Sequence, residues 1–288
     1  MKPPPFTYHN PSSLDEAFDL LVACKNARVL AGGQSLIPML NFRYLQPDHI
    51  IDVAGIKNIS GIEMRNDDLH IGAMTRQREV EFSDLVAQHC PLMHEAIRQV
   101  GHRQTRNRGT VGGSLAHLDP AAELPLVACA TGATIHVAGK RGKRDFAFAD
   151  YALGFMTPAI EPDEMVTGVT VPAWAPGHGA AFVEFARREG DFAMVAVAVL
   201  LELDAKGVIA RASLALGGAM ATAQCMPEAE AALIGQKPTT ETFAAAAGAC
   251  TKIEAMDDVH APAAYRQHLA GVLARRALAA AYERTTKV

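Results

Sequence analysis

Ala31-Gly32-Gly33-Gln34-Ser35-Leu36 and Thr110-Val111-Gly112-Gly113-Ser114 are the two stretches that decide the fold of this chain. Each follows or joins apolar sequence of strand character, and neither matches a Walker loop or a GxGxxG fingerprint. Paired glycines let a backbone approach a bulky anion, because no Cβ blocks the way. Consecutive exposed N–H groups in such a turn form a concave anion site. Two such segments indicate a clamp on a diphosphate, and therefore a dinucleotide bound outside the Rossmann scheme.

Length and composition describe an ordinary globular chain. Its 288 residues are enough for two domains with their own cores, and 49% of them are hydrophobic and 20% charged. A net charge of −4 gives no reason to expect nucleic acid or an anionic membrane as a partner. The longest apolar run, residues 192–201, is too short for a membrane span, and residues 1–6 lack the apolar region of a secretion signal. We expect no transmembrane segment and a cytoplasmic location.

The cysteines are few and scattered. Five are present, without a CxxC or CxH pairing, at positions Cys24, Cys90, Cys129, Cys225 and Cys250. This usage predicts free, mostly buried thiols and no zinc or iron–sulfur site within the chain.

Hydrophobic periodicity predicts an α+β protein. In the first half, helices are expected over 12–24, 35–40, 85–100 and 121–131, and strands over 28–30, 49–53 and 68–74. Ser13 and Glu16 form a capping box for the first helix, and Cys90-Pro91 interrupts the third. A hairpin joins residues 132–138 to 143–146.

The second half begins after a Pro/Gly-rich linker at 172–179. Three strand-like runs follow at 181–186, 195–203 and 209–216, and residues 222–283 are Ala-rich and mostly helical in period. The layout is a loop-rich front domain followed by a sheet with helices packed on it.

Three charged or aromatic segments each allow a structural and a ligand-binding interpretation. The run Arg98 to Gly109 is basic and free of carboxylates, which suits a diphosphate or a docking partner, or else a solvated helix end. Asp119 and Glu123 fit an N-cap and a first helical turn, or else carboxylates that accept hydrogen bonds from ligand hydroxyls. Gly190-Asp191 fits a tight turn, which in a second interpretation places Phe192 against a flat aromatic ligand.

No nucleophile–base pair stands out, so no catalytic residue is assigned. Ser35 and Ser114 lie in glycine segments rather than in a GxSxG elbow, and such serines more often bind backbone or phosphate than attack a carbonyl.

Taken together, the motifs resemble one family. Residues 31–38, 106–117 and 187–193, in this order, are similar to the FAD-binding medium subunit of the molybdenum hydroxylases, the xanthine dehydrogenase and aerobic carbon monoxide dehydrogenase group. The resemblance covers essentially the whole chain and extends to residues 263–269 and 275–278 near its end. Thr105 departs from the Val or Ile that is usual at this position.

The resemblance implies a vanillyl-alcohol-oxidase/PCMH-type FAD-binding domain at 1–175 and a C-terminal α/β domain, an antiparallel sheet with helices, at 176–288. It places the FAD pyrophosphate on Gly32 to Leu36 and closes the segment Thr110 to Ser114 over the cofactor. Glu123 falls where the family has an acidic FAD ligand, usually Asp. Glu184 falls where part of the family has a lysine, and that contact is not carried over. The cofactor-binding candidates are Ala31, Gly32, Gly33, Gln34, Ser35, Leu36, His102, Thr110, Gly112, Gly113, Ser114, Asp119, Glu123, Val166 and Phe192.

The resemblance also implies partners. A large subunit holds the molybdenum cofactor, as molybdopterin cytosine dinucleotide, and a small subunit holds two [2Fe-2S] clusters that pass electrons to the flavin and on to an external acceptor. A dimer of heterotrimers is expected. Because the flavin supplies the redox chemistry, no protein acid–base dyad is needed.

The substrate of the complex is predicted from a few single residues, which are weaker evidence than the three motifs. Gln34, His102 and the pattern of Glu184 with Arg187-Arg188 are more similar to medium subunits of aromatic N-heterocycle hydroxylases than to those of carbon monoxide enzymes. Two other hypotheses are kept: a self-contained flavin oxidase or dehydrogenase of the same fold, and a non-catalytic assembly protein that binds no flavin.

Overall fold

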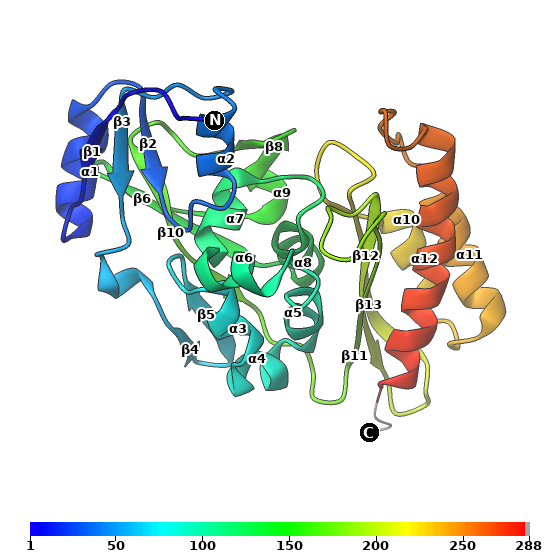
Figure 1. The fold of residues 1–288 in the computed structure, drawn as a ribbon. Coiled ribbons are helices and arrows are strands. Elements are labelled where there is room, and N and C mark those ends of the chain that lie inside the picture. The colour runs from blue at the N-terminus through cyan, green and yellow to red at the C-terminus, as the bar shows by residue number, and fades with distance from the viewer. Residues whose placement is uncertain (286–288) are drawn as a thin grey trace.

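The computed structural model describes residues 1–285 and is an α+β structure built in successive layers (Figure 1). A small N-terminal sheet lies at one end, a five-stranded sheet with short helices forms the middle, and a second sheet backed by helices forms the other end. The α+β arrangement predicted from the sequence is confirmed. Residues 286–288, the last of the predicted second domain, lie outside the described residues.

The N-terminal layer is a parallel sheet of order β1-β3-β2, formed by Thr7–His9, His49–Asp52 and Ala27–Leu30. Helix α1 (Leu14–Ala23) packs on it through Ala17, Phe18 and Leu21. The Ser13 hydroxyl accepts a hydrogen bond from the Glu16 N–H at 3.2 Å, so the predicted N-cap is confirmed. The Glu16 carboxylate returns to the Ser12 N–H at 2.7 Å rather than to Ser13, which shifts the capping box by one residue.

The middle layer carries a sheet of order β4-β5-β10-β6-β7. Its strands are Ile62–Arg65, Asp68–Gly72, Glu164–Val171, Thr134–Gly139 and Gly142–Ala147, and all neighbours run antiparallel. The predicted hairpin is the pair β6–β7. A two-stranded ribbon of β8 (Ala152–Gly154) and β9 (Thr157–Pro158) follows α9 (Phe148–Tyr151).

Short helices fill the space beside this sheet. In chain order they are α2 (Leu36–Asn41), a 3-10 turn at Lys57–Ile59, α3 (Gln77–Glu81), α4 (Asp84–His89), α5 (Pro91–Ala96), α6 (Arg103–Arg108), α7 (Val111–His117) and α8 (Glu123–Thr131). Pro91 occupies the first position of α5, where its missing N–H costs nothing, so the predicted interruption at Cys90-Pro91 is confirmed.

Two features of this layer differ from the sequence prediction. The second glycine segment is not the turn with exposed N–H groups that the sequence indicates, because Val111 to His117 form α7 with Thr110 as its N-cap. Helix α8 begins after Ala122 rather than after Asp119, whose carboxylate instead accepts a hydrogen bond from the Ala121 N–H at 2.9 Å. Local capping patterns recur at closely spaced positions, and tertiary packing decides which of them is used.

The far layer is an antiparallel sheet of order β11-β12-β13-β14, formed by Gly179–Phe185, Val195–Leu203, Ile209–Gly217 and Gln224–Cys225. Its three long strands were predicted. In β12, Ala196, Ala198 and Leu200 belong to the core shared with α5 and α8, whereas Val195, Val197, Val199 and Leu201 belong to the core under the C-terminal helices. Both faces are therefore buried, which explains the continuous apolar run.

The C-terminal helices α10 (Pro227–Leu233), α11 (Thr240–Cys250) and α12 (Ala263–Glu283) cover the outer face of this sheet (Figure 1). The buried guanidinium of Arg266 on α12 donates to the carbonyls of Met194 and Gly218 and to the Asp258 carboxylate. None of the helices within residues 1–285 has both the length and the apolarity to cross a membrane.

Candidate functional site

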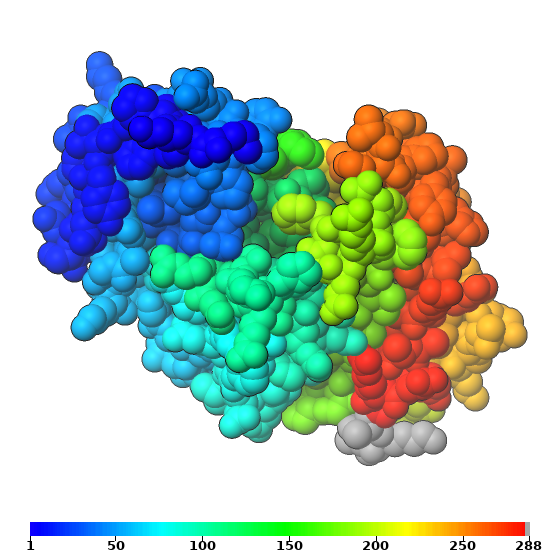
Figure 2. All heavy atoms as spheres, viewed as in Figure 1, coloured from blue at the N-terminus to red at the C-terminus, as the bar shows by residue number. Residues whose placement is uncertain are grey.

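A cavity of about 770 Å³ lies between the N-terminal layer, helices α6 to α8 and the turn that precedes β12. The surface is hollowed in Figure 2 between the blue N-terminal part and the yellow-green segment of the second half. Every cofactor-binding candidate from the sequence lines this cavity, with the exception of His102. The fold thus brings together residues from four separate stretches of the chain.

The first glycine segment forms one wall of the cavity, where β2 leaves its sheet and α2 begins. Gly33 has a φ of +72°, a backbone conformation that favours glycine. Within residues 1–285, the backbone N–H groups of Gly32, Gly33, Gln34 and Ser35 make no hydrogen bond. Consecutive unpaired N–H groups at a cavity wall form a nest for an anion, as the glycine pattern predicts.

The second glycine segment meets the cavity in a different way. Its N–H groups are already used: Val111 donates to the Thr75 carbonyl at 3.1 Å, Gly112 to the Ala73 carbonyl at 2.8 Å, and Gly113 to the Thr110 hydroxyl at 3.1 Å. A Cβ on Gly112 would lie 2.4 Å from the Cβ of Ala73. These glycines allow close helix packing, so the segment closes the cavity rather than offering a second anion nest.

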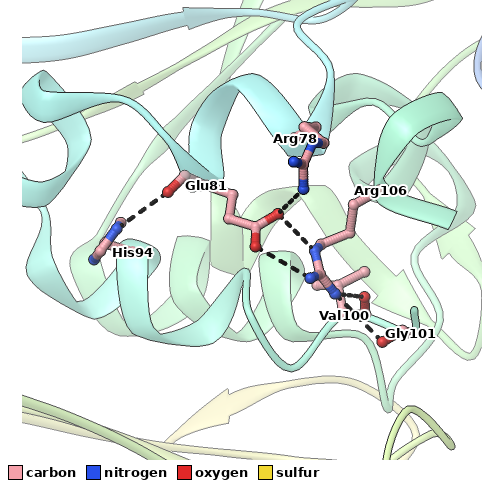
Figure 3. A network of polar contacts seen from close by, with 6 residues as sticks. All are labelled: Arg78, Glu81, His94, Val100, Gly101 and Arg106. Atoms are coloured by element: carbon pink, nitrogen blue, oxygen red, sulfur yellow. Dashed lines mark hydrogen bonds and ion pairs between the residues drawn. The ribbon is translucent and has the colours of Figure 1, made fainter. Parts of the chain in front are cut away.

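An ion pair holds the loop between α5 and α6 in place (Figure 3). Arg106 donates to both carboxylate oxygens of Glu81, at 2.9 and 3.1 Å, and to the carbonyl of Val100 at 3.0 Å. The side chains of Arg106 and Glu81 are only 11% and 13% exposed, and the hydrogen bond from Arg106 lowers the pKa of Glu81. Arg106 therefore serves the fold, whereas Arg98, Arg103 and Arg108 are exposed.

His102 lies outside the cavity lining. It is the exposed residue that precedes α6, and its ring lies against Gly190, where a Cβ would come within 2.5 Å of the His102 Cε1. The histidine thus packs against the turn between β11 and β12, whose residues Gly190, Asp191 and Phe192 line the cavity.

Three carboxylic acids, Asp119, Glu123 and Glu184, lie near the N-terminal end of α8. Asp119 and Glu123 line the cavity, and burial raises the pKa of Glu123 to about 8, with the nearby Glu184 contributing. Burial also raises the pKa of Glu184 to about 7, and its Oε2 has no hydrogen-bond partner within the described residues. A Glu123 that stays protonated near neutral pH can donate as well as accept a hydrogen bond.

Apolar groups complete the wall. Phe192 is 61% exposed although it lines the cavity, whereas Val166 on β10 is buried. An aromatic ring held out into a cavity gives a flat ligand a surface on which to stack.

Arg28 and Gln77 are among the lining residues that the sequence interpretation missed. Arg28 on β2 is exposed, and among the described residues it contributes the only lysine or arginine side chain of the lining. Gln77 on α3 is buried, and its Oε1 has no hydrogen-bond partner in the part of the chain that the structure describes. No local pattern marks either residue, because each is brought to the cavity by the tertiary fold alone.

Comparison with known proteins places this cavity in a family. Residues 4–174 match the FAD binding domain in molybdopterin dehydrogenase, and residues 180–281 match the CO dehydrogenase flavoprotein C-terminal domain. A dinucleotide-binding subunit is the class that the fold and the cavity define. The chain belongs to the family of FAD-binding medium subunits of molybdenum hydroxylases.

Individual relatives match over nearly their whole length. The chain is 37% identical over 286 residues to the 6-hydroxypseudooxynicotine dehydrogenase complex subunit alpha of Paenarthrobacter nicotinovorans, covering 99% of this chain and 97% of the relative. It is also 37% identical to the nicotine 6-hydroxylase medium subunit of the same organism, covering 99% and 100%. A structure of carbon monoxide dehydrogenase from Hydrogenophaga pseudoflava superposes with a TM-score of 0.96 at 37% identity, covering 99% and 100% of the two chains.

These matches confirm the predicted family, the fold class, the FAD cofactor and the assignment as an oxidoreductase subunit. The groups that line the cavity also fit FAD, independently of these matches. The four unpaired N–H groups suit an anionic diphosphate, and the unpartnered Gln77 oxygen and the protonated Glu123 suit a ligand that carries hydroxyls and amide groups.

Proposed function

We propose that this chain binds FAD in the 770 Å³ cavity, with the diphosphate on the N–H groups of residues 32–35. The observation that carries the proposal is this run of unpaired N–H groups on a cavity wall. The remaining candidates then have distinct tasks. The segment 110–114 closes the cavity. Asp119 and Glu123 form hydrogen bonds with hydroxyl groups of the cofactor, and Val166 and Phe192 contact its flat ring system. His102 acts on the cofactor only through the turn at Gly190.

In the assembled enzyme, the bound FAD supplies a centre that accepts single electrons and delivers pairs of electrons. We propose that a small subunit with [2Fe-2S] clusters donates these electrons, and that a large subunit with a molybdopterin cytosine dinucleotide oxidises the substrate. The chain's own residues bind and orient the cofactor and exclude water from it. A dimer of heterotrimers is the proposed assembly, which light scattering of the purified complex would test.

The substrate proposed for the complex is an aromatic N-heterocycle. Two relatives are named for nicotine and 6-hydroxypseudooxynicotine, and Gln34 and His102 point in the same direction. The sequence of the neighbouring large-subunit gene tests this, because an active-site loop of the carbon monoxide type would contradict it.

We also propose a division into domains at 1–175 and 176–288 and a cytoplasmic location. The connection 172–178 and the limits of the two family matches support the boundary. One core nevertheless includes residues from both sides of it, so we expect the two domains to unfold together. Five free cysteines are in keeping with a reducing compartment.

The first experiment is a visible spectrum of the purified chain, with chromatography of the flavin released by acid. We expect non-covalently bound FAD. A colourless chain that takes up no added FAD would contradict the proposal and favour an assembly role. Substrate turnover by this chain without partners would instead favour a self-contained flavin enzyme.

A pair of variants tests the diphosphate position. Gly33→Ala and Gly207→Ala both place a Cβ at a positive φ, +72° and +71°, at a strain cost of about 1–2 kcal/mol each. Gly207 lies in the exposed turn between β12 and β13. We expect only Gly33→Ala to lose FAD, while equal FAD content in both variants would contradict the placement.

A further inference from the structure

Three side chains that could ligate a metal converge in the N-terminal layer, away from the cavity lining described above. His9 is the last residue of β1, His49 is the first residue of β3, and Cys24 follows the end of α1. In the parallel pairing of β1 with β3, His49 lies opposite Thr7. His9 and His49 therefore project from the same face of the sheet, which α1 covers.

The potential ligand atoms lie close together. The Nε2 of His9 is 3.0 Å from the Nδ1 of His49, and the Sγ of Cys24 is 3.8 Å from the Nε2 of His9. All three atoms lie within 4.8 Å of one another. In a tetrahedral zinc site, Zn–N and Zn–S bonds of about 2.1 and 2.3 Å place two nitrogens about 3.4 Å apart and a nitrogen about 3.6 Å from the sulfur. The His9–His49 and Cys24–His9 distances are thus within about half an ångström of this arrangement, and the Cys24–His49 distance does not exceed 4.8 Å.

The surroundings allow an ion to enter. His9, Cys24 and His49 are each half-buried, and Cys24 also lines a second hollow of about 420 Å³ next to Lys25 and Arg28. A water molecule can reach the cluster from this side and complete a four-coordinate shell. A histidine pair that shares one proton accounts for the short N–N distance. It does not account for the Cys24 thiol beside the His9 nitrogen.

The geometry points to a binding site for Zn²⁺ formed by His9, Cys24 and His49, with water as the fourth ligand. Two imidazoles and one thiolate are ligands that Zn²⁺ prefers. Binding replaces the His9–His49 hydrogen bond with two N–Zn bonds, so the ring that carries the shared proton moves it to its other nitrogen, and the thiol proton is released to water. The absence of CxxC or CxH spacing predicted no zinc site. That argument does not apply here, because the three ligands come from different elements.

Bound zinc would cross-link β1, β3 and the end of α1. The strand β2 pairs with β3 and leads directly into the first glycine segment. Zinc would therefore stabilise the support of that segment without touching the cavity, and we expect the untagged, full-length chain to melt at a higher temperature with zinc than after treatment with a chelator.

The test measures the zinc content of the untagged chain by mass spectrometry and its Zn²⁺ affinity by titration calorimetry. We expect about one zinc per chain, and Cys24→Ser or His49→Gln to weaken binding by at least about tenfold. Melting curves in chelator show whether each variant folds. The thermal shift with zinc should disappear in the variants even where the chelated proteins melt at the same temperature as the parent.

The chain offers matched controls. His70 and His136 form another half-buried histidine pair, with ring centroids 5.5 Å apart compared with 5.2 Å for His9 and His49. Cys225 is a half-buried cysteine beside a second thiol. His70→Gln and Cys225→Ser should retain zinc. A parent chain that binds no zinc, or binding that is equal in the Cys24 and Cys225 variants, would overturn the proposal.

Discussion

The backbone of Gly32 lies directly against that of Gly109, so the first glycine segment and the residue just before the second one meet without side chains between them. A Cβ on Gly32 would come within 2.8 Å of the Gly109 Cα and 2.3 Å of the Arg108 carbonyl oxygen. Real Cβ atoms do not approach backbone this closely, so any side chain at residue 32 must push the stretches apart. One wall of the cavity is therefore set by a contact that only glycine can make.

Replacement of Gly32 by alanine should widen this contact. We expect Gly32→Ala to lower the free energy of unfolding by about 1–3 kcal/mol, the usual cost of forcing a group into a packed site, and to reduce FAD retention. Urea unfolding and flavin absorbance measure the two effects. Gly248→Ala is the control, because Gly248 is exposed in α11 and a Cβ there meets nothing within 4 Å. It should stabilise the chain by about 0.5–1 kcal/mol. Equal behaviour of the two variants would contradict the packing argument.

The ion pair of Arg106 with Glu81 should contribute to stability rather than to ligand binding directly. Arg106→Gln leaves the mostly buried carboxylate of Glu81 with only its 3.5 Å contact to Arg78, and we expect a loss of about 3 kcal/mol in the free energy of unfolding. The double variant Glu81→Gln, Arg106→Gln should lose less than the sum of the single changes. Additive losses would show that the two groups act independently.

This pair also has a pH dependence of known sign. The pKa of Glu81 is lower in the folded chain, so its contribution is present above the ordinary carboxyl pKa and is lost as the pH falls through the lowered value. Unfolding curves of the parent and the double variant, measured at falling pH, should therefore converge.

Glu123 should produce the opposite dependence. Its pKa is raised from 4.5 to about 8, so between these values the folded chain holds a proton that the unfolded chain has released. Stability of the flavin-free chain should fall as the pH rises through this window, by at most about 1.4 kcal/mol per pH unit from this group. Glu123→Gln keeps the neutral form, and its unfolding free energy should depend less on pH. Parallel pH profiles for parent and variant would contradict a protonated Glu123.

Much of the fold could be predicted because its signals are local. The Ser13 cap, Pro91 at the start of α5 and the apolar run of β12 each reflect a periodicity or a capping rule that holds within a few residues. The second glycine segment was predicted as a turn with exposed N–H groups, because the local sequence shows only the glycine pair. Two adjacent glycines are poor helix formers, and α7 exists because Thr110 caps it and Ala73 packs against Gly112.

The site residues likewise include some that could be predicted from the sequence and some that could not. Gly33 could be recognised, since a glycine pair after a strand has a direct physical meaning. Arg28 and Gln77 could not, because an exposed strand arginine and a helix glutamine are common everywhere and only the tertiary fold brings them to the cavity. The same holds for His9, Cys24 and His49, which no sequence spacing relates.

Phe192 offers the sharpest separation of binding from folding. Because the ring is 61% exposed, Phe192→Ala should leave the melting temperature of the flavin-free chain unchanged. Loss of a stacking surface should weaken FAD binding by about 1 kcal/mol, or roughly five- to tenfold in Kd, measured by titration of the flavin-free chain with FAD. Phe42→Ala is the matched control, since Phe42 is 58% exposed and lies outside the cavity lining. An equal Kd in both variants would remove Phe192 from the cofactor site and leave the turn at Gly190 with a purely structural role.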